Sequence, residues 1–158
     1  NGFSLVNKLL RTERLALSDP APFDQEKILA DVLLTPTRIY VQSLKPVIAE
    51  GRIKALAHIT GGGLVDNLPR VLSHGMMAKI DARRWQAPPV FRWIYETAQM
   101  TPESLLRTFN CGIGMVAIVA GGDAKAVTDQ LKKNGETVYH LGTLVQGDGP
   151  PCVEITGA

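Results

Sequence analysis

Three consecutive glycines behind a strand-like segment give the strongest chemical signal in this sequence. The segment reads HITGGG, from His58 to Gly63, and a helical pattern begins directly after it. Three glycines remove every Cβ atom from the turn, so a ligand can approach the backbone closely. Their N–H groups and the N-terminus of the following helix suit an anion such as phosphate. A tight turn without a ligand fits the same pattern, and a P-loop is excluded because no Gly-Lys-Ser/Thr follows.

Polar side chains flank this turn. Thr60 adds a hydroxyl group, and Asn67 lies one turn inside the predicted helix. His58 lies near the end of the predicted strand, where an imidazole can donate to phosphoryl oxygens or move a proton near neutral pH. A lone histidine at a strand end is also common as a structural residue, but we take His58 as a candidate catalytic residue. The candidates for binding phosphate or substrate at the turn are Thr60, Gly61, Gly62, Gly63 and Asn67.

A second glycine-containing motif, RTFNCGIGM, spans Arg107–Met115. Together with Ala117 it matches the G-x-G-x-x-A pattern of dinucleotide sites, which requires a strand before the motif and a helix after it. Here a predicted helix precedes the motif and an apolar strand follows it, so we reject the dinucleotide interpretation. Arg107 is either a bidentate ligand for phosphate or carboxylate or a positive charge facing the carbonyl groups at a helix end.

The cysteines, histidines and carboxylates show no metal-binding pattern. Cys111 and Cys152 are not a C-x-x-C pair, and His74 and His140 are isolated. No metal site is therefore predicted in this chain. Because no histidine lies near it in the sequence, Cys111 is expected to be a small buried thiol rather than a nucleophile. Two cysteines without a disulfide framework favour a reducing, cytoplasmic setting.

The elements that position these residues follow from hydrophobic periodicity and from proline and glycine. Helices are predicted over residues 2–11, from the cap Asp24 to Leu34, and over residues 38–50, where Pro46 must kink the helix or lie in its first turn. From residue 53 onward, strands and helices alternate, which predicts helices packed on one sheet. The strands are expected over 53–59, 77–81, 113–120, 138–145 and 152–155. Helices are expected over 64–72, with a kink at Pro69, and over 90–98. Two further helices are expected to begin at the caps Thr101 and Asp123, the second ending at Lys133.

The composition indicates one globular domain. The chain has 158 residues, of which 45% are hydrophobic and 20% charged, and its net charge is +2. A domain of this length can bury a sizeable core. Its basic residues form no block that would indicate nucleic acid or a membrane surface as a partner, and no stretch reaches the ~20 apolar residues of a membrane span. The chain begins without a methionine, as a fragment of a longer protein would.

Successive blocks of the chain resemble the second domain of the aminoimidazole ribonucleotide synthetase (phosphoribosylformylglycinamidine cyclo-ligase) family. The blocks are NGFSLV at the start, LLTPTRIYV at 33–41, AHITGGGLVDNLPRVL at 57–72, IDARRW at 80–85 and RTFNCGIGM at 107–115. The resemblance implies an α+β fold, a three-layer α/β/α sandwich with a mixed sheet, partly ferredoxin-like. Residues 1–158 would then be the single C-terminal domain of a two-domain synthetase, and the N-terminal ATP-binding domain would be absent from this chain.

The resemblance also implies a reaction and its cofactors, ATP and Mg²⁺. ATP phosphorylates the formyl amide oxygen of formylglycinamidine ribonucleotide, and an amidine nitrogen then closes the imidazole ring, which releases phosphate and ADP. Phosphoryl transfer depends mainly on positioning and charge stabilisation. In the family, the N-terminal domain forms a dimeric β-barrel and most of the ATP site, so a homodimer through that domain is implied. The second domain completes the cleft.

Carried over by motif, the resemblance places Thr60 and the three glycines at the phosphate end of that cleft, with His58 and Asn67 beside them. Asn1 belongs to a Ser-Asn-Gly block at the domain junction, whose serine this sequence lacks. Asn1 and Arg107 complete the candidates for substrate or phosphate binding. In the related selenophosphate synthetase, the position of His58 resembles a metal-binding aspartate. The histidine departs from that pattern, and metal ligation by this domain is not predicted.

Two other interpretations stay open. Another enzyme of the superfamily, such as a formylglycinamidine synthetase or a thiamine-phosphate kinase, is disfavoured by the AHITGGG and PTRIY blocks. A non-catalytic binding or assembly module is the alternative from a different class, because a domain without the ATP-binding half lacks most of the nucleotide site.

Overall fold

Helices and short strands follow one another in the computed structural model, which describes residues 2–158. The helices are α1 (Phe3–Thr12), α2 (Leu29–Leu33), α3 (Val41–Ala49), α4 (Gly63–Asn67), α5 (Pro89–Thr97), α6 (Pro102–Thr108) and α7 (Ala124–Lys133). The strands are β1 (Pro20–Ala21), β2 (Asp24–Ile28), β3 (Ile53–His58), β4 (Met76–Asp81), β5 (Met115–Val119), β6 (Gly142–Gln146) and β7 (Cys152–Thr156). This mixture of helices with antiparallel and mixed sheets confirms the α+β class. Within the described range, no helix has the length and apolar character needed to cross a membrane.

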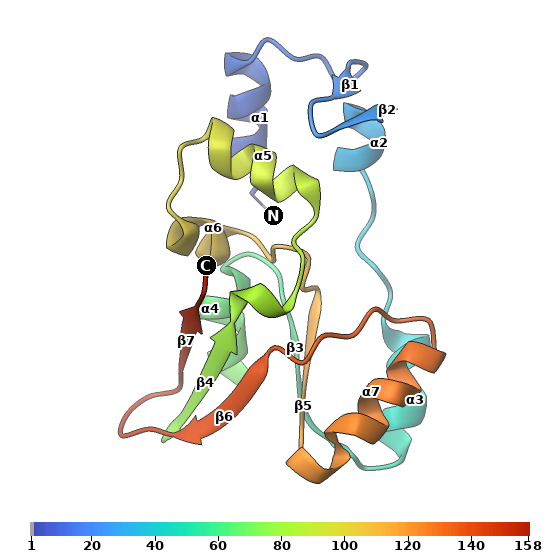
Figure 1. The fold of residues 1–158 in the computed structure, drawn as a ribbon, viewed down its shortest axis with the longest axis vertical. Coiled ribbons are helices and arrows are strands. Elements are labelled where there is room, and N and C mark those ends of the chain that lie inside the picture. Colours follow the sequence, from blue (N-terminus) through green and yellow to red (C-terminus); the bar gives the residue numbers. More distant parts are fainter. Residues whose placement is uncertain (1) are drawn as a thin grey trace.

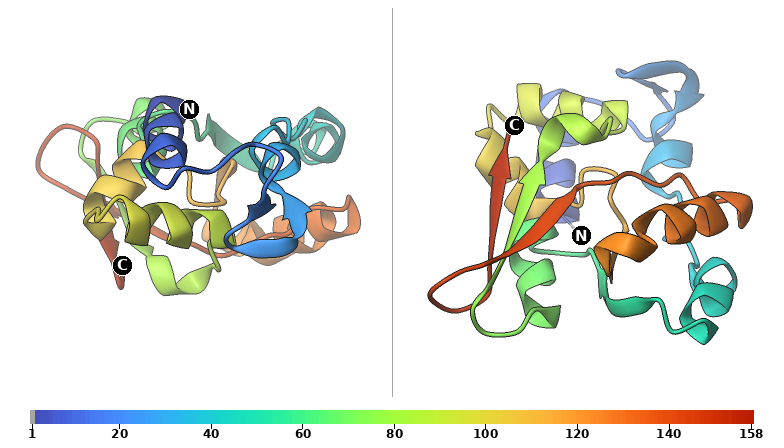
Figure 2. Two further views of the ribbon diagram at one scale, coloured as in Figure 1. Left: turned by 90° about the horizontal axis from the view of Figure 1, so that it is seen from above. Right: turned by 60° about the horizontal axis from the view of Figure 1, so that its bottom comes forward.

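The strands of residues 2–158 are divided among three sheets. β1 pairs with β2, β3 pairs antiparallel with β5, and β4 lies between β6 and β7, antiparallel to β6 and parallel to β7. Figure 2 shows β4 flanked by these two strands. The expectation of one shared sheet is therefore wrong. In the described part of the chain, β5 pairs with β3 alone and β6 with β4 alone, and residues of β5 and β6 line a common cavity.

The main core holds the glycine turn in place. α1 carries apolar side chains on one helical face, and Val6, Leu9 and Leu10 of that face are buried. They belong to the same buried cluster as Ile59 and Leu64, which lie immediately before and after the segment Thr60–Gly63. The first predicted helix is thus confirmed, and its burial helps to anchor the segment that the sequence singled out.

A smaller cluster joins α3 and α7, which lie together at the lower right of Figure 1. Leu44 and Val47 of α3 are buried against Val127 and Leu131 of α7. Pro46 lies inside α3 and not in its first turn. A proline there removes one helical hydrogen bond, so packing between the two helices contributes to holding α3 in place.

Residues 24–28 form a strand where a helix is predicted. They are β2, which pairs with β1 in a hairpin, and α2 begins only at Leu29. Asp24 caps no helix, since its carboxylate instead accepts a hydrogen bond from Lys27 Nζ at 2.7 Å. The N–H of Leu29 donates to the carbonyl oxygen of Asp19 at 2.9 Å. Pairing with the preceding strand therefore overrides the local capping pattern.

The structure confirms the predicted helix cap at Thr101 but not the one at Asp123. Thr101 caps α6, because its Oγ1 accepts a hydrogen bond from the N–H of Ser104 at 3.2 Å. Asp123 occupies the N-cap position of α7 but makes no capping bond with its side chain. Its φ and ψ of −92° and −14° are helical, whereas a capping residue is normally extended. The helix predicted over residues 64–72 changes form at Pro69, since α4 ends at Asn67 and a 3₁₀ turn follows at Leu68–Val71.

Candidate functional site

The two glycine motifs, far apart in the sequence, meet at the ends of β3 and β5. His58 is the partner of Met115 in the β3–β5 ladder. The N–H of Ile59 continues the connection by donating to the carbonyl oxygen of Gly114 at 2.9 Å. The fold thus brings RTFNCGIGM beside HITGGG, which neither motif predicts by its own spacing.

The glycine turn, defined here as Thr60–Gly63, is exposed at its start and buried at its end. Gly62 and Gly63 have φ angles of 96° and 57°, in the left-handed region that favours glycine. A Cβ atom on Gly63 would overlap the carbonyl oxygen of Leu106 and lie 2.7 Å from that of Phe109. The lack of a Cβ atom at Gly63 therefore allows α4 to pack directly against the end of α6.

Two backbone hydrogen bonds close the turn. The N–H of Gly63 donates to the carbonyl oxygen of Thr60, and the N–H of Asp66 donates to that of Gly62, both at 3.0 Å. Neither bond uses the N–H groups of Gly61 or Gly62. These two groups, rather than that of Gly63, are therefore the candidate donors to an anion.

Asn67 braces the turn from within the protein. Its side chain is buried, and its Nδ2 donates to the carbonyl oxygens of Gly63 at 2.8 Å and Gly61 at 3.0 Å. The hydroxyl of Thr60 donates to Asn67 Oδ1 at 3.5 Å. The amide of Asn67 is thus committed to the turn itself, and we expect its effect on a ligand to pass through the shape of the turn.

Arg107 reaches the same place from α6. Its Nη1 lies 3.2 Å from Asp66 Oδ1, and the two side chains are 54% and 42% exposed. Asp66 in turn lies beside Gly62, since a Cβ atom there would be 2.6 Å from Asp66 Cβ. An exposed ion pair contributes only about 0–1 kcal/mol. The guanidinium is therefore free to exchange this carboxylate for the oxygens of a phosphate.

His58 is exposed and contacts an aromatic residue to which the sequence assigned no role. Tyr40, the residue before α3, meets His58 edge-on, with ring centroids 6.2 Å apart and an interplanar angle of 68°. Tyr40 also lines the cavity between β5 and β6, whose volume is about 660 Å³. Partial burial raises the pKa of the Tyr40 phenol. Tyr40 belongs to the PTRIY block, but nothing in that block's pattern points to His58.

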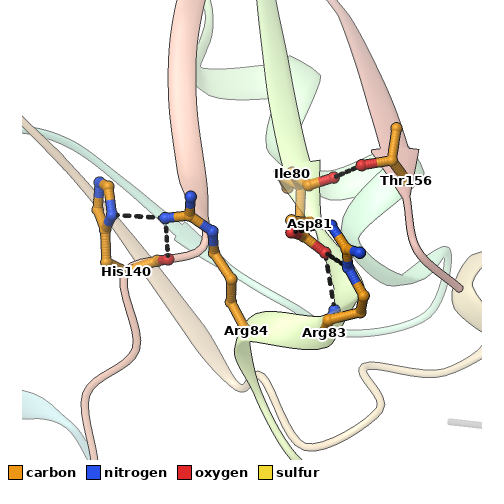
Figure 3. A network of polar contacts seen from close by, with 6 residues as sticks. All are labelled: Ile80, Asp81, Arg83, Arg84, His140 and Thr156. Atoms are coloured by element: carbon orange, nitrogen blue, oxygen red, sulfur yellow. Dashed lines mark hydrogen bonds and ion pairs between the residues drawn. The ribbon is translucent and has the colours of Figure 1, made fainter.

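The IDARRW block forms a polar network at the end of β4, shown in Figure 3. Asp81 accepts hydrogen bonds from the side chain and the N–H of Arg83 at 2.9–3.0 Å, which lower its pKa to about 2. Arg84 Nη1 lies 2.9 Å from His140 Nδ1. Because a guanidinium only donates, His140 Nδ1 is the acceptor in this contact. His140, isolated in the sequence, therefore has a partner in the fold.

Cys111 is a buried thiol, as expected. Its side chain is 2% exposed, with Sγ 3.8 Å from the carbonyl oxygen of Phe109. Burial raises the pKa of the thiol to about 12. Because the thiolate is the reactive form, this residue is unsuited to act as a nucleophile near neutral pH.

The structure thus gathers most of the residues proposed from the sequence. His58, the glycine turn, Asn67 and Arg107 lie around one strand-to-helix junction. Asn1 lies outside the described residues. Among residues 2–158, no three His, Cys, Asp or Glu side chains gather where they could hold a metal ion.

Two comparisons place this arrangement among known proteins. Residues 1–151 match the family model described as AIR synthase related protein, C-terminal domain. The fold is similar to that of a thiamine-monophosphate kinase from Stenotrophomonas maltophilia, with a TM-score of 0.63 and 16% identity. The match covers 98% of this chain and 46% of that protein, so the chain spans less than half of its length.

The family match is decisive, whereas similarity to the kinase at this identity shows the fold alone. The matched range contains the glycine turn, the RTFNCGIGM motif and the strands that join them. The chain therefore belongs to the family of AIR synthase related proteins, in which it corresponds to the C-terminal domain.

Proposed function

We propose that this chain is the C-terminal half of a phosphoribosylformylglycinamidine cyclo-ligase. The enzyme would use ATP to convert formylglycinamidine ribonucleotide to aminoimidazole ribonucleotide in purine biosynthesis. The observation that carries the proposal is the meeting of HITGGG and RTFNCGIGM, joined by the Ile59–Gly114 hydrogen bond and the Arg107–Asp66 ion pair. Both blocks resemble that enzyme family, and membership of the wider family supports the proposal. A cytoplasmic homodimer, formed through the other half, is part of it.

The glycine turn fits the phosphate end of a nucleotide. Gly61 is exposed, and the bonds that close the turn leave its N–H and that of Gly62 for a ligand. When bound, ATP supplies the phosphoryl group that activates the formyl oxygen of the substrate. The role of this chain is to hold phosphate oxygens on the turn, while Arg107 offsets their negative charge.

The same residues do not fit a Mg²⁺ site. Mg²⁺ takes oxygen ligands, chiefly carboxylates, phosphates and water, in octahedral geometry. The carboxylate at the turn, Asp66, is paired with Arg107, and residues 2–158 contain no cluster of three potential ligands. This domain is therefore not expected to hold Mg²⁺ by itself, and we assign the metal to the other half of the protein.

Reconstitution tests the activity. We expect no aminoimidazole ribonucleotide from the 158-residue chain alone, because one side of the cleft cannot enclose both ATP and substrate. Ring closure and ATP hydrolysis should be measured for this chain, for the ATP-binding half, and for the two halves joined. Product from the joined protein only would support the proposal. Product from this chain alone, or none from the joined protein, would contradict it.

His58 is the proposed group for proton transfer or charge stabilisation. In the two-domain protein, His58→Ala is expected to lower kcat about 10²–10⁴-fold. Little change in Tm is expected because His58 is exposed. The matched control is His74→Ala, another exposed histidine. A variant with near-normal kcat that melts several degrees lower would make His58 a structural residue.

The second candidate function is a non-catalytic binding or assembly module. Leu34, Ile39 and Val41, in and beside the connection between α2 and α3, are 70%, 81% and 64% exposed. Exposed apolar side chains that form a patch mark an interaction surface. The joined protein separates the two candidates, since a module would bind the other half without restoring turnover.

A further inference from the structure

Tyr40 occupies the junction between the two glycine motifs. On one side its ring contacts His58 edge-on. On the other side its hydroxyl lies against Gly114, where a Cβ atom would overlap Tyr40 Oη and lie 3.0 Å from Cζ. Gly114 is not among the glycines with positive φ, so its backbone conformation does not require glycine. The space taken by Tyr40 does.

The environment of His58 makes Tyr40 the side chain best placed to hold it. His58 is exposed, and among residues 2–158 its imidazole has no hydrogen-bond or ion-pair partner. Tyr40 is itself anchored, because its carbonyl oxygen accepts hydrogen bonds from Ser43 Oγ at 2.9 Å and from the N–H of Leu44 at 3.0 Å. Leu44 is buried in the α3–α7 cluster. With its backbone held in this way and its hydroxyl against Gly114, the Tyr40 ring restricts the positions that the neighbouring imidazole can adopt.

We propose that Tyr40 is a positioning residue, which fixes the His58 imidazole relative to the glycine turn, and that Gly114 is glycine so that Tyr40 can reach this position. The ring carries this role, because the ring contacts His58 and the hydroxyl faces Gly114. The expected effect on rate rests on the proposed function of His58. The expected effect on the location of the imidazole does not.

Four variants separate these contributions. Tyr40→Ala removes the ring, and Tyr40→Phe keeps it without the hydroxyl. Gly114→Ala leaves Tyr40 chemically intact but displaces it, since the new methyl group takes the space of Oη. Gly122→Ala is the matched control, because Gly122 has open space around its Cβ position and no positive φ. Tyr40→Leu replaces Tyr40→Ala if the latter does not fold.

The first measurement is the spectrum of His58 in the two-domain protein labelled with ¹³C-histidine. The His58 resonance is identified as the one missing in His58→Ala. We expect it to shift in Tyr40→Ala and Gly114→Ala, and to stay unchanged in Tyr40→Phe and Gly122→Ala. An unchanged resonance in Tyr40→Ala would overturn the positioning role.

The second measurement is kcat and KM of the same variants. Misplacing a reacting group by about 1 Å costs up to roughly 10²-fold in rate, so we expect Tyr40→Ala and Gly114→Ala to lose roughly ten- to a hundred-fold in kcat with little change in KM. In a Tyr40→Ala background, Gly114→Ala should cause no further loss. Additive losses, or a loss in Tyr40→Phe equal to that in Tyr40→Ala, would refute the proposal. A shifted resonance combined with normal kcat in His58→Ala would instead refute only the function of His58.

Discussion

The two cysteines show at the residue scale how burial decides chemistry. Cys111 is buried and Cys152 is exposed. Burial raises the pKa of Cys111 to about 12, which keeps the thiol protonated. A similar contrast separates Asn67, whose amide is used inside the glycine turn, from His58, whose imidazole is exposed. Residue type suggests what a side chain can do, and its surroundings decide whether it is available.

We therefore expect a thiol reagent at pH 8 to modify Cys152 but not Cys111 in the folded chain. Mass spectrometry should find a single label, which Cys152→Ser removes, and a second label after unfolding in denaturant. Because folding raises the pKa of Cys111 from 9.0 to about 12, the folded chain keeps this proton where the unfolded chain loses it. The contribution of this group to stability therefore falls as pH rises through that interval. Native labelling of Cys111 would show that it is not buried.

At the scale of helices and strands, partners outside an element often decide its form. Residues 24–28 become a strand because β1 lies beside them. The apolar run at residues 113–120 predicts a buried strand, but all five residues of β5 within it are only half-buried. The reason is that, among the described residues, β5 has one strand neighbour and borders the cavity. Where the controlling contact is local, as at the Thr101 cap, the sequence pattern is sufficient.

The two caps give a matched test at this scale. Thr101→Ala should lower the free energy of unfolding by about 1 kcal/mol, because the Ser104 N–H loses its acceptor. Asp123→Ala should cost clearly less, since Asp123 makes no capping bond. Urea unfolding of both variants measures the difference. Equal losses would contradict the assigned capping bonds.

At the scale of the whole molecule, close approach of α4 to α6 ties the two motifs together. Gly63 allows this approach, because only a residue without a Cβ atom fits beside the carbonyl oxygens of Leu106 and Phe109. The same contact places Arg107 next to Asp66. The geometry of the candidate site therefore depends on backbone packing between segments that are distant in the sequence.

Gly63→Ala is expected to destabilise the chain by several kcal/mol, since it combines a left-handed φ of 57° with overlap against backbone atoms. Gly51→Ala is the control: its φ is 71°, but apart from its chain neighbours no atom of residues 2–158 lies within 4 Å of its Cβ position. Backbone strain alone should cost about 1–3 kcal/mol there. Urea unfolding compares the two variants. Similar losses would mean that α4 and α6 are not as closely packed as in the structure.

The sequence by itself determined the features that depend on neighbouring residues. The amphipathic face of α1, the Thr101 cap, the change of helix form at Pro69 and the strand–glycine–helix order of the turn all follow from contacts within a few positions. Resemblance to family motifs added the class of the protein, which the family match supports.

Only the tertiary structure decided what lies around the turn. The inward amide of Asn67, the Arg107–Asp66 pair and the Tyr40–His58 contact each join groups whose relation the sequence pattern does not state. The division of the strands into three sheets has the same origin. Local propensity and periodicity describe one segment at a time, whereas these contacts form only when separate segments compete for the same space and the same hydrogen-bond partners.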